Sequence, residues 1–324
     1  MNGTYLQENG KIRCMLCPHE CLIGEGQTGI CRVRANDKME LSLPYYGVLS
    51  ACAMDPIEKK PLFHFHPGTN ILSAGFYGCN FRCPFCQNFH ISQHVSDNPS
   101  KTNPEDLVEL AVNRKSIGIA YTYSEPLVHF EYVLNTAKIA RSHGLKNVLV
   151  TNGYIHAKPA EELLQYIDAA NVDLKSFNGD FYRKEIKGSL EPVLAFIRKA
   201  SQYICLEVTT LVIPGKNDSE TEMRDISSFL ASIDRDIPFH LSCYYPTYKY
   251  TVGATPPDLV IKLADIAREK LRFVYIGNVG AREVNTICPD CGSVLIRRRG
   301  YTVTIEDFEN GKCKNCGSSI PIVA

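Results

Sequence analysis

Short apolar runs alternate with amphipathic, helix-like stretches between about residue 71 and residue 278. The apolar runs are ten residues long or shorter, rich in Val, Ile, Tyr and Phe, and nearly continuous in apolar character. Strands that are buried on both faces look like this, so the pattern predicts a parallel sheet. The predicted strands are ILSAGFYG (71–78), GIAYTYS (118–124), KNVLVTN (146–152), AANVDLK (169–175), ICLEVTTLVI (204–213), PFHLSCYY (238–245) and RFVYIGN (272–278).

Helix signals lie between the predicted strands. Pro104 stands at the first position of a helix that continues through DLVELAVNRKS. A second helix, from about 126 to 143, is expected to stop at Gly144, and a third is expected to open at Ser219. Repeated strand–helix units of about 30 residues imply right-handed crossovers, and therefore either a doubly wound sheet or a barrel.

Polar residues gather where the predicted strands give way to loops, in YSE (123–125), TNG (151–153), DLK (173–175) and PGKND (214–218). In both architectures the chemistry collects at the carboxyl ends of the strands. Structural turns would explain TNG and PGKND, but they do not explain charged residues at the ends of apolar strands. Glu125 and Lys175 are therefore predicted to be functional.

Composition sets the size and surroundings of this fold. A chain of 324 residues can bury one large α/β core with small appended modules. Lys and Arg together number 35, as do Asp and Glu, so we do not expect nucleic acid as a partner. The stretch MNGTYLQENGKIRC lacks the apolar core of a signal peptide, and no apolar run approaches the roughly 20 residues of a membrane-spanning helix. We expect a cytoplasmic protein without a membrane partner.

Eleven of the fourteen cysteines fall into three short groups, within residues 14–31, 79–86 and 288–316. Thiolates spaced two or three residues apart in a reducing compartment indicate metal sites rather than disulfides. The remaining cysteines are Cys52, Cys205 and Cys243. The last two stand in apolar, strand-like runs, which is typical of buried and inert thiols.

The groups suggest three segments: a cysteine-rich N-terminal segment (1–60), the strand–helix repeat (61–284) and a four-cysteine C-terminal module (285–324). In the C-terminal module, two Cys-x2-Cys pairs are separated by 21 residues, and each pair is followed by a glycine. This spacing predicts a closed, tetrahedral four-thiolate site, in a zinc ribbon or with a rubredoxin-like iron. The ligands, here named the tail cysteines, are Cys288, Cys291, Cys313 and Cys316.

The first segment contains CMLCPHECLIGEGQTGIC, which again offers four thiolates. They suffice for a closed site, which would hold either zinc or a second iron–sulfur cluster. We name them the N-terminal cysteines: Cys14, Cys17, Cys21 and Cys31.

The middle group, GCNFRCPFCQN, holds only three cysteines: Cys79, Cys83 and Cys86, here named the triad. A [4Fe–4S] cluster takes one thiolate per iron, so three cysteines leave one iron open, as in catalytic metal sites. The alternative is a zinc site whose fourth ligand lies far away in the sequence. The position of the triad directly after the first predicted strand favours the cluster.

A Cys-x3-Cys-x2-Cys motif after the first strand of a strand–helix repeat resembles the signature of the radical S-adenosylmethionine superfamily. Within it, the chain is most similar to the pyruvate formate-lyase activating enzyme group, and in particular to the radical enzymes of the AmmeMemoRadiSam system. The resemblance implies a partial (β/α)6 barrel. It runs through CMLCPHEC, GICRVR, FHFHPGTNILSAGFYGCNFRCPFCQN, YTYSEPLVHFEY, LVTNGYI, VDLKSF, LVIPGKND and the CPDCG and CKNCG pairs.

The resemblance also implies cofactors and roles. The triad would hold a [4Fe–4S] cluster that reductively cleaves S-adenosylmethionine, and the resulting 5′-deoxyadenosyl radical would abstract hydrogen from a substrate. Phe85 would pack near the adenine, and Ser124 and Glu125 would meet the methionyl amino group. Asn152, Asp173 and Lys175 would line the ribose and carboxylate. An electron donor such as flavodoxin or ferredoxin would be a partner.

The chain departs from the activating enzymes in places. The glycines of their Gly-Gly-Glu turn are Tyr123 and Ser124 here, and the Asp of their Asp-Thr-Asn-Gly motif is Val150. A histidine near their sixth strand has two candidate matches, His240 and Tyr245. These differences weaken the inference that the substrate is a glycyl radical enzyme. They leave the inferred cofactor chemistry unchanged.

Three functions therefore stay open. The first is a radical enzyme that acts on an unidentified small molecule or protein. The second is an activase that generates a glycyl radical on a partner enzyme. The third is a non-catalytic iron–sulfur or zinc protein, against which Glu125 and Lys175 argue.

Overall fold

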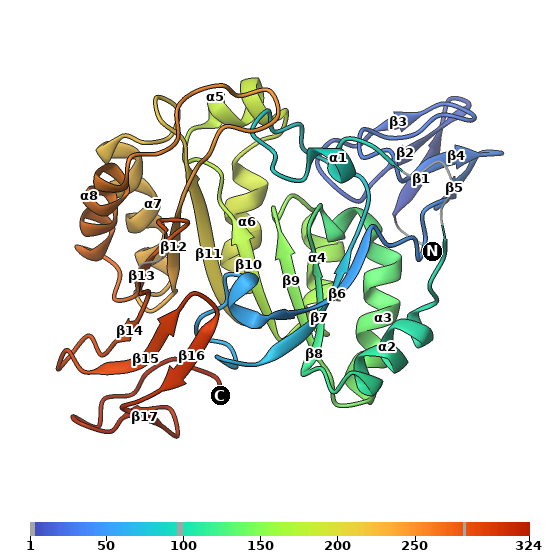
Figure 1. Ribbon diagram of the computed structural model, residues 1–324. Coiled ribbons are helices and arrows are strands. Elements are labelled where there is room, and N and C mark those ends of the chain that lie inside the picture. Colours follow the sequence, from blue (N-terminus) through green and yellow to red (C-terminus); the bar gives the residue numbers. More distant parts are fainter. Residues whose placement is uncertain (1–3, 96–99, 281–282) are drawn as a thin grey trace.

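The computed structural model describes residues 4–95, 100–280 and 283–324. Its centre is an eight-stranded sheet in the order β13-β12-β11-β10-β9-β8-β7-β6 (Figure 1). All seven predicted strands are present, and each pairs in parallel with its neighbour. They are β7 (Asn70–Gly75), β8 (Gly118–Thr122), β9 (Lys146–Thr151), β10 (Ala169–Asp173), β11 (Cys205–Val212), β12 (Phe239–Cys243) and β13 (Val274–Gly277).

The eighth strand, β6 (Ala51–Pro56), pairs antiparallel with β7 and forms one edge of the sheet. No strand was predicted in the cysteine-rich N-terminal segment (1–60). The first residues of β6 are exposed and a proline closes it, which is common on edge strands but gives no apolar run to detect.

Strand order decides between the two predicted architectures. Because each strand from β7 to β13 lies beside its predecessor, the sheet never reverses direction, as a doubly wound sheet must. With β6 and β13 at its two edges, the sheet is an open, partial barrel. Right-handed crossovers place the connecting helices on one face. These helices are α2 (Pro104–Asn113), α3 (Phe130–Ser142), α4 (Ala157–Leu164), α6 (Glu191–Ala200), α7 (Glu220–Ile233) and α8 (Pro257–Arg268).

The predicted helix signals are confirmed. Pro104 occupies the first turn of α2, and Gly144 follows α3 with a φ of 73°. The Ser219 side chain accepts a hydrogen bond from the backbone N–H of Glu222, which caps the start of α7.

The opposite face of the sheet is covered by the strap, which we define as residues 57–66, including η1 (Ile57–Lys59). Apolar strap residues pack against Ala120 and Val148 on this face. The Glu207 carboxylate of β11 accepts the backbone N–H groups of Phe63 and His64, both at 2.7 Å, and lies 2.6 Å from His240 Nε2. These bonds fix the strap to the sheet below the carboxyl ends of the strands.

The outer segments form small sheets of their own. The N-terminal segment contains a three-stranded sheet and a hairpin, and the C-terminal segment contains another three-stranded sheet and a hairpin. Their strands are β1 (Tyr5–Glu8), β2 (Lys11–Cys14), β3 (Leu22–Ile23), β4 (Ala35–Asp37), β5 (Glu40–Ser42), β14 (Thr286–Ile287), β15 (Val294–Arg299), β16 (Thr302–Ile305), β17 (Phe308–Glu309) and β18 (Lys312–Cys313). The remaining short helical turns are α1 (Phe89–Ser92), η2 (Pro126–His129), α5 (Gly179–Phe181) and η3 (Tyr182–Ile186).

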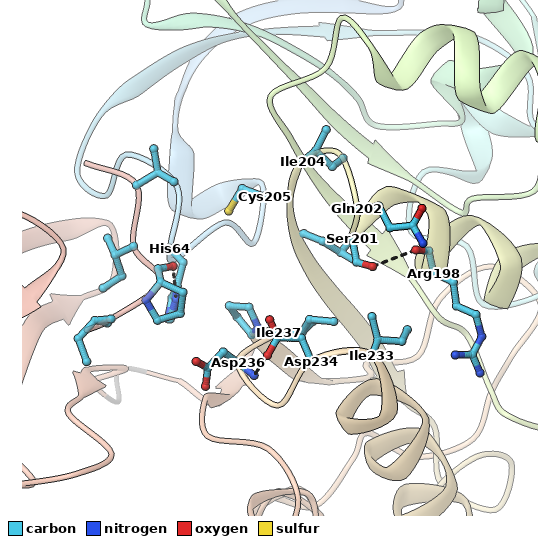
Figure 2. A pocket seen from close by; sticks show the side chains of 16 residues that line it. His64, Arg198, Ser201, Gln202, Ile204, Cys205, Ile233, Asp234, Asp236 and Ile237 are labelled. Carbon is cyan, nitrogen blue, oxygen red and sulfur yellow. Dashed lines mark hydrogen bonds between the residues drawn. The ribbon is translucent and has the colours of Figure 1, made fainter. Parts of the chain in front are cut away.

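An open cavity of about 720 Å³ lies at the amino ends of β11 and β12 (Figure 2). His64 of the strap and Cys205 lie on one side of it, and Ser201 and Gln202 lie on the other. Because parallel sheets carry their chemistry at the opposite, carboxyl ends, this cavity is not the candidate active site. No helix in the described part of the chain is both long and apolar enough to cross a membrane.

Candidate active site

The triad lies on the loop that follows β7. Cys83 is buried, whereas Cys79 and Cys86 are partly exposed. The Cys79 sulfur accepts the backbone N–H of Phe81 at 3.3 Å, and the Cys86 sulfur lies 3.2 Å from the Ser92 hydroxyl. Burial raises the pKa of Cys83 to about 12, and burial together with the charge of Glu125 raises the pKa of Cys79. A bound cation would be needed to hold these sulfurs as thiolates at neutral pH.

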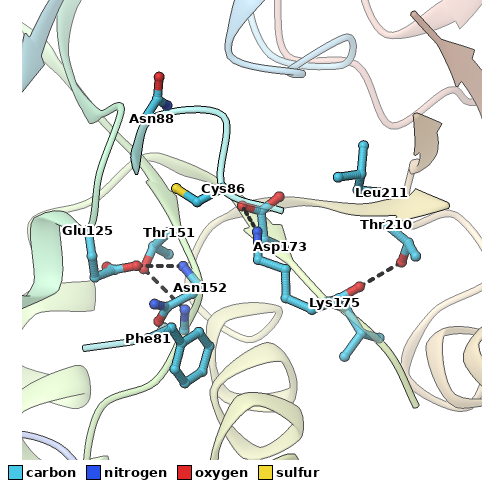
Figure 3. A network of polar contacts seen from close by, with 12 residues as sticks. Phe81, Cys86, Asn88, Glu125, Thr151, Asn152, Asp173, Lys175, Thr210 and Leu211 are labelled. Carbon is cyan, nitrogen blue, oxygen red and sulfur yellow. Dashed lines mark hydrogen bonds and ion pairs between the residues drawn. The ribbon is translucent and has the colours of Figure 1, made fainter. Parts of the chain in front are cut away.

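Five of the predicted polar residues stand at three neighbouring strand ends. Ser124 and Glu125 follow β8, Asn152 follows β9, and Asp173 and Lys175 stand at the end of β10 (Figure 3). Parallel pairing brings these ends to one edge of the sheet, next to the loop of the triad.

Glu125 is a buried carboxylate whose hydrogen-bond partners are all neutral. Its Oε1 accepts the Thr151 hydroxyl at 2.6 Å and the Leu127 N–H at 3.0 Å, and its Oε2 accepts the Asn152 N–H at 2.8 Å (Figure 3). Burial raises the pKa of Glu125 to about 7 although these hydrogen bonds oppose the shift. A ligand ammonium group would favour the ionised form of this carboxylate.

Asn152 joins this edge to the triad. Its Nδ2 donates to Asn80 Oδ1 at 2.8 Å and lies 3.8 Å from the Cys79 sulfur, while its Oδ1 accepts the Tyr154 N–H at 2.8 Å. Both ends of the amide are thus engaged within the protein. In this structure Asn152 fixes the position of Cys79.

Asp173 and Lys175 form an ion pair, with Lys175 Nζ 2.6 Å from Asp173 Oδ2 (Figure 3). Burial by itself would lower the pKa of Lys175, but the charges of Asp173 and Cys83 outweigh it and raise that pKa. A protonated lysine therefore stands between the end of β10 and the triad.

One cavity, of about 330 Å³, unites these groups. It is lined by every residue for which the sequence predicted a role at the triad: Cys79, Cys83, Cys86, Phe85, Ser124, Glu125, Asn152, Asp173 and Lys175. The two candidate matches for the histidine of the activating enzymes do not line this cavity. His240 is buried against Glu207, and Tyr245 is exposed and donates to the Asn278 carbonyl.

Sequence reasoning missed several residues of this cavity. Asn88 donates to the Tyr123 carbonyl at 2.6 Å, and the Tyr123 hydroxyl donates to Asp55 of β6. Tyr123 has a φ of 72°, a left-handed conformation that favours glycine. The Tyr123 ring also lies under Lys60 Nζ, at 4.5 Å. Interactions with β6 and the strap thus hold this turn in its left-handed conformation. The other lining residues that were missed are Lys59, Pro61, Gln87, Ser92, Thr209, Leu211, Ser242 and Asn278.

Comparisons with known proteins agree with this arrangement. The family model of the radical SAM superfamily matches residues 75–225. The uncharacterized protein MJ0808 of Methanocaldococcus jannaschii is 43% identical over 325 residues, which span 98% of this chain and 97% of that protein. The chain belongs to the radical SAM superfamily.

Two further relatives are informative. The pyruvate formate-lyase-activating enzyme of Clostridium pasteurianum is 25% identical over 165 residues, covering 49% of this radical SAM chain and 68% of that enzyme. The crystal structure of Streptococcus suis SuiB bound to S-adenosylmethionine has a TM-score of 0.51 at 13% identity. It covers 69% of this chain and 53% of the SuiB chain, and it supports the fold alone.

A radical SAM domain implies a [4Fe–4S] cluster and S-adenosylmethionine, and the residues of this cavity fit both. The triad offers three soft sulfur ligands for four irons, which leaves one iron for another ligand. The Glu125 carboxylate, held by neutral donors, suits the ammonium group of a methionyl moiety. The cavity beside the triad provides space for a small ligand.

The tail cysteines of this radical SAM enzyme form a compact group. The four sulfurs lie within 4.8 Å of one another, with Cys288 and Cys316 at 3.6 Å and Cys291 and Cys313 also at 3.6 Å. Four thiolates around one ion at a metal–sulfur distance of about 2.3 Å would be separated by about 3.8 Å. The geometry therefore fits a single tetrahedral ion, either zinc or iron.

The N-terminal cysteines are brought together beside the loop of the triad. Three of them are buried and Cys21 is partly exposed. Burial, with the nearby charges of Cys31, Cys14 and Cys21 adding to it, raises the pKa of Cys17 to about 12. The four thiols thus gather at one place although they span 18 residues of sequence.

Proposed function

We propose that this protein is a radical SAM enzyme in which the triad holds the [4Fe–4S] cluster and S-adenosylmethionine occupies the adjoining cavity. When bound, the cluster supplies the electron that cleaves S-adenosylmethionine to a 5′-deoxyadenosyl radical, which abstracts hydrogen from the substrate. The observation that carries the proposal is the cavity, because three cysteines and six further predicted residues, from three strand ends and one loop, line it.

Each lining residue has a role that its surroundings support. The Glu125 carboxylate accepts hydrogen bonds from the methionyl ammonium. Because the protein surrounds this buried carboxylate with neutral donors only, the ammonium supplies its positively charged partner. The Lys175 ammonium, oriented by Asp173, attracts the methionyl carboxylate. Ser124 Oγ donates to the Phe76 carbonyl at 2.8 Å and so fixes the turn that presents Glu125. Phe85 packs against Phe181 and Tyr250 and offers an apolar wall for the adenine.

The substrate is a small molecule or a protein that reaches the open side of this cavity. A flavodoxin or ferredoxin is the expected class of electron donor. The cytoplasm is the expected location, because a chain with fourteen cysteines and no disulfide among the described residues suits a reducing compartment. The relation to the AmmeMemoRadiSam system rests on the sequence motifs.

Replacement of Cys83 by alanine tests the proposal. Anaerobically reconstituted wild-type protein, reduced in the presence of S-adenosylmethionine, should release 5′-deoxyadenosine, and Cys83→Ala should abolish that release. Cys243→Ala is the matched control, since Cys243 is also buried but lies on β12 and does not line the cavity. Full activity of Cys83→Ala would refute the assignment. A wild-type protein that never cleaves S-adenosylmethionine would instead favour a non-catalytic metalloprotein.

Deuterium transfer identifies the substrate class. Candidate substrates labelled with deuterium, or cell lysate grown in heavy water, are incubated with the reduced enzyme. A true substrate transfers deuterium into 5′-deoxyadenosine, whereas an unrelated compound leaves the nucleoside unlabelled.

A second candidate function is activation of a glycyl radical enzyme. It is favoured by the relative named pyruvate formate-lyase-activating enzyme, of which the match covers 68%. An activase would act on a glycine of a large partner protein. Electron paramagnetic resonance of the reaction with a candidate partner would then show a glycine-centred radical, and a silent spectrum under conditions of active cleavage would exclude that partner.

A further inference from the structure

The N-terminal cysteines have no role in the proposed function, yet most of them are buried and one of the sulfurs accepts a backbone hydrogen bond. Cys14, Cys17 and Cys31 are each less than a tenth exposed. Cys14 and Cys17 pack in the same core as the barrel, whereas Cys31 packs with Val33 and Val128. The Cys21 sulfur accepts the backbone N–H of Ile30 at 3.4 Å. Backbone N–H groups directed at sulfur are a common feature of iron–sulfur sites, where they tune the reduction potential.

The spacing of the sulfurs separates two kinds of site in this chain. Among the described residues, the tail cysteines are the one group of three or more ligating side chains close enough to share a single ion. The N-terminal cysteines do not form such a group, and neither do the cysteines of the triad. A [4Fe–4S] cluster binds each thiolate to a different iron, so its thiolates stand further apart than thiolates on one ion. The N-terminal cysteines thus resemble the triad and differ from the tail cysteines.

The N-terminal cysteines also lie directly behind the loop of the triad. A Cβ atom on Gly78, the residue before Cys79, would stand 2.3 Å from the Cys31 carbonyl oxygen. The Arg82 guanidinium donates to the carbonyls of Cys79 at 2.8 Å and Phe81 at 2.9 Å, and also to the carbonyl of Ile30. One side chain therefore bonds to the residue before Cys31 and to Cys79 itself.

We propose that Cys14, Cys17, Cys21 and Cys31 hold a second [4Fe–4S] cluster rather than a zinc ion, and that this cluster carries single electrons. Four thiolates occupy all four irons, which leaves no open position for a substrate or cofactor. Its chemistry is then limited to accepting one electron from a low-potential donor protein and passing that electron to the cluster at the triad, which is reduced as the N-terminal cluster is reoxidised. The N-terminal cysteines suit this role because they lie behind Cys79. Only the transfer of the electron from this second cluster rests on the proposed function.

The test uses the full chain without the first site. The variant Cys79→Ala/Cys83→Ala/Cys86→Ala is reconstituted anaerobically with ferrous iron and sulfide and then assayed for iron, zinc and acid-labile sulfide. We expect about four sulfides per chain, about four irons beyond any ion at the tail cysteines, and a [4Fe–4S] signal in electron paramagnetic resonance after reduction with dithionite. Acid-labile sulfide is decisive, because neither zinc nor a rubredoxin-like iron at the tail cysteines contains it.

Zinc without sulfide, or no metal beyond one ion per chain, would overturn the proposal. Adding Cys21→Ser to the same variant provides the second measurement. Cys21 is the partly exposed member of the group, so this change should alter or abolish the signal while circular dichroism stays that of the parent. An unchanged signal would show that the cluster lies elsewhere. The wild-type release of 5′-deoxyadenosine is measured separately, so failure of one proposal does not imply failure of the other.

Discussion

Glu125 illustrates how one buried side chain can make the stability of the cofactor-free protein depend on pH. Its folded-state pKa is raised from 4.5 to about 7, so burial disfavours the ionised form. For a raised pKa, the stabilising contribution is fully present below the unfolded value and is lost as pH rises through the folded value. The loss should therefore fall between pH 4.5 and about 7.

Glu125→Gln isolates this contribution, because glutamine does not titrate. We expect the melting temperature of the wild type, measured relative to that of the variant, to fall as pH rises across this window. Differential scanning calorimetry of both proteins without S-adenosylmethionine provides the comparison. If the difference between the two melting temperatures did not change with pH, Glu125 would be either ionised or neutral throughout this range.

Glu125→Gln should also bind S-adenosylmethionine about 10- to 150-fold more weakly than the wild type. This loss is the equivalent of one charge-assisted hydrogen bond of about 1.5–3 kcal/mol.

At the residue scale, the sequence was informative where function depends on local spacing. The triad follows a strand at fixed intervals, and Glu125 and Lys175 stand out because they are charged residues at the ends of apolar strands. Lys59 and Tyr123 could not be predicted in the same way. Lys59 reaches the cavity from the strap, and the left-handed conformation of Tyr123 depends on contacts with Asp55 and Lys60 that only the folded chain creates.

Among the elements, the loop of the triad depends on a close fit to the N-terminal segment. Gly78 and Gly144 have similar positive φ angles, 76° and 73°. A side chain at Gly78 would collide with the Cys31 backbone, whereas no atom lies within 4 Å of a Cβ at Gly144. We expect Gly144→Ala to lower the free energy of unfolding by about 1–2 kcal/mol, the cost of the left-handed conformation alone.

Gly78→Ala should cost clearly more and should also reduce the release of 5′-deoxyadenosine, because the loop must move away from Cys31. Urea titration gives the free energies, and the nucleoside assay reports on the cavity. Equal losses for the two variants would mean that the N-terminal segment adapts freely to the loop.

The elements of the repeat were predictable because each one carries its own signal. Seven buried strands appear as apolar runs, and Pro104, Gly144 and Ser219 mark helix ends by backbone chemistry that acts within a few residues. The edge strand β6 was missed because its pairing partner, rather than its own composition, makes it a strand. The pattern of strands and helices alone left open the choice between a doubly wound sheet and an open barrel, since strand order is a property of the assembled sheet. The partial barrel was predicted only through the family resemblance.

At the scale of the whole molecule, the C-terminal module is tied to the barrel. Arg298 donates to the Phe63 carbonyl of the strap at 2.6 Å, and the Pro321 carbonyl lies 3.1 Å from His64 Nδ1. The backbone N–H of Val323 donates to the His64 carbonyl, and the Val323 carbonyl accepts the backbone N–H of His66. If the module becomes disordered, the strap should therefore also lose contacts that hold it against the central sheet.

Cys313→Ala removes one ligand of the tail site and should lower the melting temperature of the whole chain. A small metal module folds only with its ion, so its order is lost with the ligand. A loss of about 2 kcal/mol would lower the melting temperature of a chain of 324 residues by about 3 °C. Cys52→Ala is the control, because Cys52 is exposed and belongs to none of the three groups. An unchanged melting temperature for Cys313→Ala would argue against a structural metal.

The strand order of the central sheet has a further consequence during synthesis on the ribosome. From β8 to β13, each strand pairs with the strand translated just before it. Every new strand therefore meets a partner that is already in place, while β6 protects the other edge of the growing sheet from the outset. Until the next strand emerges, the newest one presents an open, apolar edge that could pair with another nascent chain. Pauses in translation between these strands should accordingly be the moments at which this protein is most prone to aggregate.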